Sequence, residues 1–243
     1  MSVCDVSIVM LAHNGAEFTR HALEGILAAE THPWEMFLVD NCSDDATPEL
    51  IREFEPRFRE AGIAFTTWRN GENKGCSLAR NEAWVKATSR YTVLIDNDAV
   101  VCTRDWLAKF IRQFEEHERL GIVGAKMIYP YQPHRIQCAG VGLLDELFHP
   151  VQYEDLDLCV RARLKGYEVA YTPDVEMYHF EGITTASFGQ DEYKVNIARN
   201  SLKFRERYHE LFRTFTDELP AEEFRWLKRS ELGLRPELDL ALC

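Results

Sequence analysis

The feature that most constrains this chain is a short apolar run at residues 91–98, YTVLIDND, which ends in two acidic side chains. Apolar and β-branched residues bounded by polar ones predict a buried strand. Because side chains alternate along a strand, Asp96 and Asp98 leave its end on the same side. Two adjacent carboxylates repel each other, so a divalent cation with oxygen ligands would stabilise them. An ordinary turn after a strand is the alternative explanation.

The composition is that of a globular chain with a sizeable core. It has 243 residues, of which 46% are hydrophobic and 28% charged. The net charge is -12, and no long run of Lys and Arg is present, which argues against binding to a nucleic-acid backbone. An anionic ligand would therefore need a metal ion or a few well-placed cations.

The cysteine pattern points to a reducing compartment. The seven cysteines include no C-x-x-C pair, which argues against a disulfide framework and against a zinc site. The first residues do not have the pattern of a secretory leader, and no apolar run approaches the ~20 residues that span a bilayer. We therefore expect a cytoplasmic protein, with peripheral contact at the inner face of the membrane left open.

Strand and helix patterns alternate along most of the chain. The expected strands cover residues 5–12, 36–39, 63–68, 91–96, 121–129, 168–171 and 175–180. The expected helices cover about 16–27, 47–58, 77–87, 104–120, 154–165 and 190–215. This alternation with short connections predicts an α/β fold with a doubly wound, mostly parallel sheet flanked by helices. In such sheets ligands bind beyond the carboxyl ends of the strands.

Polar loops follow several of these strands, at Asn14, at residues 40–45 and at residues 96–98. A further loop, residues 73–75, opens the helix that carries Arg80. Its glycine permits close approach of the backbone, so that Lys74, Arg80 and free amides could meet a diphosphate. The alternative is a surface loop shaped by its glycines, with Arg80 solvated.

A second acid-rich stretch, YEDLDLCVR at residues 153–161, begins the helix that ends before Gly166. Acids in the first turn complement the helix dipole, but three are more than capping requires. If this helix start faces the Asp96 loop, a carboxylate here can take a proton from an attacking hydroxyl. His179 lies in a half-buried strand pattern and becomes a metal-ligand candidate only beside an acid pair.

Taken together, these stretches resemble the family 2 glycosyltransferases of the GT-A fold, in a rhamnosyltransferase-like bacterial branch. SIVMLAHN is similar to the opening strand of that family, LVDNCSDD to its second strand and base-binding acid, and NKGCSLARN to its glycine loop. IDND is similar to its D-x-D motif, YEDLDLCVRARLKGY to its acidic acceptor-side helix, and MYHFEG to the stretch with its late metal-binding histidine. The resemblance spans Val6 to about Phe212.

The resemblance implies inverting transfer of a sugar from a UDP- or dTDP-sugar to a hydroxyl of a glycan, lipid-linked or protein acceptor. Asp40 would accept from the uracil or thymine imide, and Asp96 would hold the ribose or assist the metal. The implied nucleotide- and donor-binding residues are Ala12, Asn14, Asp40, Asn41, Lys74, Arg80, Asp96 and Asn97. Asp98 and His179 would bind Mn or Mg, Asp155 would be the general base, and Glu154 would orient the acceptor.

The same resemblance implies a domain plan. A GT-A domain would cover residues 1–190, with a nucleotide-binding half at 1–129 and an acceptor and metal half at 130–190. A C-terminal helical extension would cover 191–243. One departure concerns the acceptor half, because the family has a longer segment, including a strand, where Gly142 here runs straight into Leu143. A second departure is His13, which stands where the family usually has an aromatic residue.

Two other functions stay open at this point. A nucleotidyltransferase also handles nucleotides with carboxylates and metal, but residues 13–17 lack its glycine-rich basic phosphate loop. A non-catalytic nucleotide-sugar-binding protein of the same fold is favoured by the short acceptor region, whereas intact Asp98, Asp155 and His179 argue against it.

Overall fold

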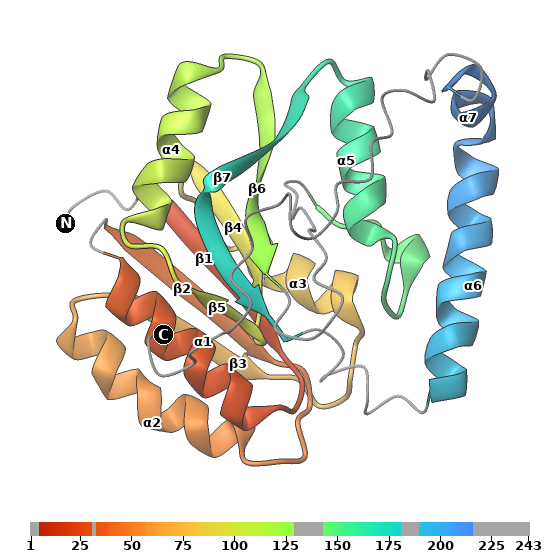
Figure 1. Cartoon of the computed structure of the whole chain (residues 1–243). Helices are drawn as coiled ribbons and strands as arrows, with labels where there is room; N and C mark the ends of the chain where they lie inside the picture. Colours follow the sequence, from red (N-terminus) through yellow and green to blue (C-terminus); the bar gives the residue numbers. More distant parts are fainter. Residues whose placement is uncertain (1–4, 31–32, 129–142, 181–189, 216–243) are drawn as a thin grey trace, which may run out of the picture.

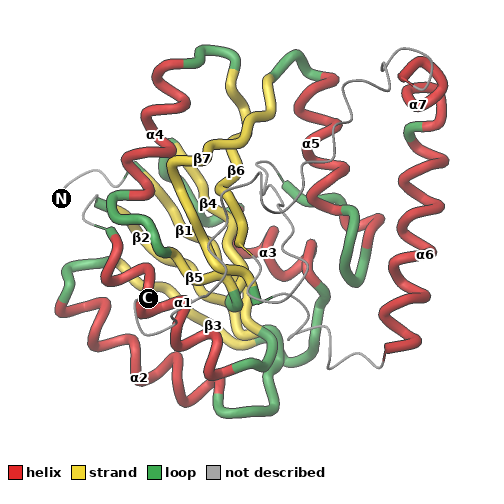
Figure 2. Tube along the Cα trace, viewed as in Figure 1, coloured by secondary structure: helices red, strands yellow, loops and turns green. Residues whose placement is uncertain are grey.

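The computed structural model describes residues 5–30, 33–128, 143–180 and 190–215. Two sheets lie side by side, with helices packed around them (Figures 1 and 2). The first sheet is entirely parallel and has the order β3-β2-β1-β4. Its strands are β1 (Val6–Ala12), β2 (Trp34–Asp40), β3 (Ala64–Arg69) and β4 (Tyr91–Asp96). The alternating pattern of the sequence predicted this arrangement, and the parallel sheet flanked by helices is confirmed.

Three helices connect the strands of the first sheet: α1 (Ala16–Ala29), α2 (Thr47–Glu60) and α3 (Cys76–Trp84). The central strand β1 is buried on both faces, as a parallel strand covered by helices should be. Ile8 and Met10 pack into the larger core with α1 and α2, whereas Val9 faces Ala83 of α3. Both faces of β1 are thus covered, and the carboxyl ends of the strands are left to form a site.

The second sheet has the order β5-β7-β6. It consists of β5 (Ala99–Val101), β6 (Leu120–Ile128) and β7 (Glu168–His179), with β5 antiparallel and β6 parallel to β7. The three-residue strand β5 was not expected from the sequence. The two expected strands at 168–171 and 175–180 form one strand instead, and the pairing with β6 shifts register between Ala125 and Lys126, opposite Thr172 and Glu176.

The remaining helices are α4 (Trp106–Glu116), the 3-10 helix η1 (Glu146–Phe148), α5 (Glu154–Leu164), α6 (Gln190–Arg207) and α7 (His209–Phe215). The helix expected at 104–120 is shorter than predicted, and the one expected at 190–215 is divided at Tyr208. Among the helices that the structure describes, none is both long and apolar enough to cross a membrane.

A pocket of about 440 Å³ separates β4 from β6. Every residue of β4 from Tyr91 to Asp96 lines it, together with alternate residues of β6 and apolar side chains of α4. Within the described residues β4 pairs only with β1 and β6 only with β7, so both strands present an edge to this pocket. Gly142, next to the shortened stretch noted in the sequence, lies outside the described residues.

Candidate functional site

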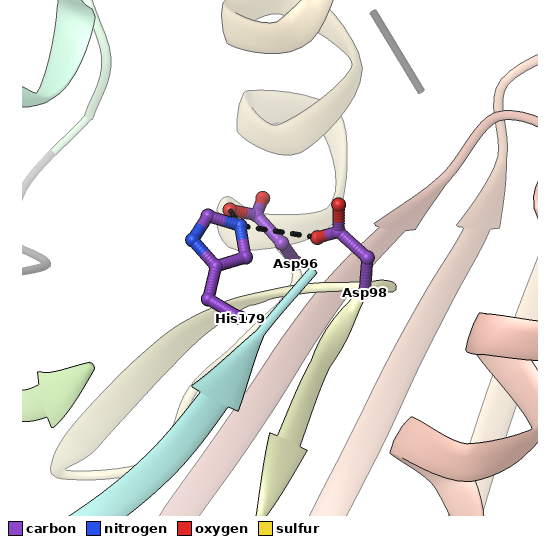
Figure 3. A group of neighbouring side chains, drawn as sticks. All are labelled: Asp96, Asp98 and His179. Atoms are coloured by element: carbon purple, nitrogen blue, oxygen red, sulfur yellow. Dashed lines mark ion pairs between the residues drawn. The ribbon is translucent and has the colours of Figure 1, made fainter. Parts of the chain in front are cut away.

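Asp96, Asp98 and His179 come together at the carboxyl ends of β4 and β7 (Figure 3). One ligand atom from each lies within 4.8 Å of the other two. The His179 Nε2 atom is 3.2 Å from Asp98 Oδ1 and 3.6 Å from Asp96 Oδ2. The antiparallel pairing of β5 with β7 produces this meeting, because it sets Ala99 opposite His179. Two carboxylates and an imidazole fit a divalent ion such as Mn or Mg.

Arg80 supports this cluster from α3. Its guanidinium forms an ion pair with Asp96 through Nη2, and its Nη1 atom donates to Cys76 Sγ at 3.1 Å. Burial opposes ionisation of Asp96, but the positive charges of Arg80 and His179 outweigh it and lower the pKa of that carboxyl. Asp96 is therefore a carboxylate at neutral pH and can act as a ligand. The alternative that Arg80 is a solvated surface residue is wrong, since its side chain is 13% exposed.

Asp40 ends β2 and is buried, with one carboxylate oxygen left without a hydrogen bond. Its Oδ1 atom accepts from the backbone N–H of Ser43 at 2.8 Å. Its Oδ2 atom lies 3.4 Å from Arg69 Nε, close enough for an ion pair but not hydrogen-bonded. A buried acceptor without a donor is costly unless a ligand completes it.

Asn41 organises the glycine loop. Its Oδ1 atom accepts from Asn70 Nδ2 and from the backbone N–H of Lys74, both at 3.0 Å. Its Nδ2 group donates to Asn73 Oδ1 at 2.8 Å and to the Gly75 carbonyl at 3.3 Å. The side chain of Asn41 therefore acts inside the loop, and its contact with a nucleoside stays a prediction.

The loop after β1 is held in a similar way. Asn14, at a positive φ of 61°, accepts through Oδ1 from the backbone N–H of Asp44 at 2.8 Å. Asn97 is buried and donates to the Asn14 carbonyl at 3.0 Å and to Thr19 Oγ1 at 2.8 Å. Ala12 is buried at the end of β1. These contacts bring the predicted donor residues to one edge of the sheet, but the binding role of each stays a prediction.

Lys74 forms an ion pair with a residue of α3. Its Nζ atom donates to Glu82 Oε1 at 2.7 Å. An ammonium group has three N–H donors, so this pair leaves donors for a diphosphate, and that contact stays a prediction.

Glu154 and Asp155 begin α5, and both interact electrostatically with Arg80. Glu154 is 7% exposed, and one of its carboxylate oxygens has no hydrogen bond. Burial, and then the charge of Asp155, raise the pKa of Glu154 to about 7. Burial also raises the pKa of Asp155, which interacts electrostatically with Asp96 and Arg80. These interactions indicate that the acid-rich helix start lies near Asp96 and Arg80, and the roles of Glu154 and Asp155 stay predictions.

The third acid of the stretch, Asp157, has a different role. It is fully buried and bound by Arg161 Nε at 2.6 Å, Arg207 Nη1 at 2.7 Å and the Tyr208 hydroxyl at 2.6 Å. Sequence reasoning missed Arg207 and Tyr208 as neighbours of the site. The contact between Asp157 and Arg207 joins residues 50 positions apart, so no local pattern in the sequence indicates it.

The comparisons with known proteins agree with this geometry. The family described as Glycosyl transferase family 2 matches residues 7–141, more than half of the 243-residue chain. The succinoglycan biosynthesis protein ExoO of Rhizobium meliloti (strain 1021) is 35% identical over 100 residues, which cover 41% of this chain and 27% of ExoO. The uncharacterized protein y4gI of Sinorhizobium fredii (strain NBRC 101917 / NGR234) is 25% identical over 246 residues, covering 80% of this chain and 26% of y4gI. The chain thus spans about a quarter of the length of these two relatives.

Solved structures share the fold. The mannosyltransferase PcManGT from Pyrobaculum calidifontis, in complex with GDP-Man and Mn²⁺, superposes with a TM-score of 0.58 at 20% identity, over 72% of this chain and 56% of PcManGT. The 1–349 fragment of S. aureus TarS, in complex with UDP-GlcNAc, gives a TM-score of 0.58 at 16% identity, over 79% of this chain and 64% of that fragment. At these identities the likeness shows the GT-A fold. Because the family match covers more than half of its residues, the chain belongs to glycosyltransferase family 2.

Proposed function

We propose that this chain transfers a sugar from a UDP- or dTDP-sugar to an acceptor hydroxyl, with inversion and with a divalent metal ion. The observation that carries the proposal is the cluster of Asp96, Asp98 and His179, whose ligand atoms lie within 4.8 Å of one another at the sheet edge. A bound Mn or Mg ion would offset the charge of the leaving diphosphate. In a chain of net charge -12, an anionic donor needs such a cation.

The environment of Asp40 supports a uracil or thymine base. A single buried oxygen, Oδ2, has no hydrogen-bond donor. The imide of uracil or thymine offers a single N–H, which matches one free acceptor, whereas guanine offers two adjacent donors. The PcManGT complex contains GDP-Man and the TarS complex contains UDP-GlcNAc, so the nucleotide must be tested on this chain directly.

The acidic start of α5 supports proton transfer from the acceptor. A raised pKa brings a carboxyl closer to the operating pH, where general-base catalysis is most effective. Asp155 is the partly buried member of the pair and the one whose pKa the charge of Asp96 helps to raise, after burial, so we assign it the base role. Glu154 is the buried member, and its free oxygen would hold the acceptor in place.

The acceptor side supports a finer expectation. The stretch between the family-like sequences at Gly142 and Leu143 is short, and a pocket of about 440 Å³ separates β4 from β6. Positioning of the acceptor accounts for a large part of catalysis by such enzymes. We therefore expect the purified chain to bind a nucleotide sugar, to hydrolyse it slowly, and to transfer to acceptors poorly unless a partner or a further segment completes the site.

The test is to incubate the chain with UDP-, dTDP- and GDP-sugars, with Mn or Mg and with EDTA, while nucleotide release and sugar transfer are measured separately. Metal-dependent release of UDP or dTDP is the expected result. Tight binding of the sugar nucleotide without any release would favour the non-catalytic binding protein. Release of pyrophosphate from a nucleoside triphosphate and a sugar phosphate would favour the nucleotidyltransferase. Efficient transfer to a defined acceptor would show that the shortened region is competent.

A further inference from the structure

One face of α6 packs along the loop that leads into α5. The residues of that face recur at helical spacing and are Asn200, Lys203, Phe204 and Arg207, with Tyr208 directly after the end of the helix. Figure 1 shows α6 on the same side of the molecule as α5 and far from α1 and α2. The aromatic ring of Phe204 packs against Phe148 and Tyr153, with centroid distances of 6.2 and 5.5 Å. The helix thus contacts the segment that immediately precedes Glu154.

Asn200 is the centre of this contact. It is fully buried, and its Nδ2 group donates to the carbonyls of Phe148 at 2.6 Å, Val151 at 2.9 Å and Gln152 at 3.2 Å. Its Oδ1 atom accepts from Lys203 Nζ at 3.1 Å. One side chain therefore supplies the donor to three backbone carbonyls between Phe148 and Gln152, and buried backbone carbonyls need such donors.

The opposite side of the same loop is attached to the donor side of the molecule. Another carbonyl of this stretch, that of Pro150, accepts from the backbone N–H of Cys76 at 2.7 Å. A Cβ atom at Gly75, where φ is +74°, would lie only 2.7 Å from His149 Nδ1 and 2.8 Å from the Pro150 carbonyl oxygen. The loop is thus held between α6 and the start of α3, the helix that carries Arg80.

The loop enters α5 through two residues in an unfavourable backbone conformation. Gln152 and Tyr153 have φ angles of 79° and 78°, in the left-handed region that residues other than glycine avoid. Such a conformation persists only when its surroundings impose it. Here the surroundings are Asn200, which binds the Gln152 carbonyl, and Phe204, which packs on Tyr153. The conformation decides the direction in which α5, and with it Glu154 and Asp155, starts.

We propose that Asn200 is a positioning residue, which holds the loop at 148–153 so that the start of α5 faces the metal cluster. Arg207 and Tyr208 support it by binding the buried Asp157 one turn into α5. α6 is therefore a working part of the site and not an appended helix. The expected loss of rate rests on the proposed function, whereas the role of Asn200 in holding the loop does not depend on it.

The test compares Asn200→Ala and Asn200→Asp with wild type and with Leu202→Ala. Asn200→Asp keeps the shape of the side chain but replaces its donors with a carboxylate, so it should be at least as harmful as Asn200→Ala. Leu202 is 66% exposed on the same helix and serves as the matched control. Three quantities are measured: UDP release from a UDP-sugar with Mn, affinity for UDP with Mn by calorimetry, and hydrogen exchange of peptides that cover residues 6–12 and 146–157.

Asn200→Ala should lower the rate of UDP release at saturating donor by roughly 10- to 100-fold, as expected when a catalytic group is misplaced. It should leave UDP affinity unchanged and speed hydrogen exchange only in residues 146–157. Rates equal to those of Leu202→Ala would overturn the proposal. So would equal losses of UDP affinity and of exchange protection in β1, because these would mean that Asn200 stabilises the whole fold.

Two further outcomes are distinguished by the same set of measurements. If the wild-type chain releases no UDP, the proposed function fails, and the exchange of residues 146–157 alone decides whether Asn200 holds the loop. If the Asn200 variants do not fold, Tyr208→Phe removes one hydroxyl from Asp157 and should show a smaller change of the same kind. Unchanged exchange in that variant would overturn the role given to α6.

Discussion

The donor side and the acceptor side of this site are built in opposite ways. On the donor side, Asn14, Asn41 and Asn97 form hydrogen bonds between loops that emerge from neighbouring strands of one close-packed sheet. On the acceptor side, the loop before α5 depends on Asn200, which lies about 50 residues further along the chain. This difference indicates that donor binding should tolerate changes that abolish transfer.

The strongest test of this separation is Asp155→Asn. The variant keeps the shape of the side chain and loses its capacity to accept a proton. We expect the transfer rate to fall roughly 10²- to 10⁴-fold, as is typical for a lost general base. Affinity for UDP with Mn should stay nearly unchanged, since Asp155 lies outside the donor loops.

The matched control is Glu49→Gln, which also removes an acid from the first turn of a helix, in this case α2. It should leave the rate unchanged, so that a loss of helix-dipole stabilisation is not mistaken for a loss of the base. A wild-type rate for Asp155→Asn would instead direct attention to Glu154, whose pKa is about 7.

The donor side is tested by Asp98→Ala and by chelation. Without the metal ion, a diphosphate would meet the carboxylates of Asp96 and Asp98 directly, and like charges repel each other. We expect UDP or dTDP to bind more weakly by about 1 to 3 kcal/mol, as calorimetry with Mn and with EDTA would measure. Asp174→Ala removes a similar charge from an exposed position of β7 and should have no effect. Equal affinity with and without EDTA would contradict a metal-dependent donor site.

The contrast between the two sides also explains what the sequence could predict. Strands β1 to β4 and helices α1 to α3 were predicted because their periodicity is local and their ends are marked by glycine, proline and polar residues. Strand β5 has only three residues, which is too short for a periodic signal. The register shift within β7 falls at residues 173–175, between the paired Thr172 and Glu176. In the sequence, residues 172–174 looked like a break between two strands.

The site was predictable to the extent that its motifs are contiguous. Asp96, Asp98 and His179 were named from strand-end position and family resemblance, and the structure brings their ligand atoms together. The ion pair of Arg80 with Asp96 and the hydrogen bonds of Asn200 were not predictable, because they join residues far apart in the chain. A polar residue in a helix has the same local appearance whether it is solvated or buried against a loop.

A smaller effect, on stability, distinguishes Glu154 from its neighbours. Its folded-state pKa of about 7 lies above the ordinary value of 4.5, so the folded protein binds the proton more tightly than the unfolded chain does. The associated stability is fully present below pH 4.5 and is lost as the pH rises towards 7. Glu154→Gln should therefore be more stable than wild type at pH 8 by about 1 to 3 kcal/mol and similar to it at pH 4.5.

Chemical denaturation at the two pH values measures this difference. Glu154→Gln should also transfer sugar more slowly, because its neutral amide lacks the carboxylate proposed to hold the acceptor. A gain in stability at pH 8 together with a loss of rate would mark Glu154 as a residue kept for function at the expense of stability. Equal stability of the two proteins at pH 8 would contradict the raised pKa.

The smallest effect compares packing beside the pocket with packing in the filled core of the first sheet, with the same substitution at two strand positions. Val123 of β6 lines the pocket between β4 and β6, whereas Val9 of β1 is fully buried against Phe37 and Ala83. Isoleucine adds one methylene group and keeps the β-branched shape, so strand preference is nearly constant.

At Val123 the added group enters open space and should raise the free energy of unfolding by about 0.5 to 1 kcal/mol. At Val9 it meets a filled core and should lower that free energy by about 1 kcal/mol or more. Urea denaturation of both variants measures the two changes, and a loss of stability at Val123 as large as that at Val9 would mean that the pocket is filled in solution.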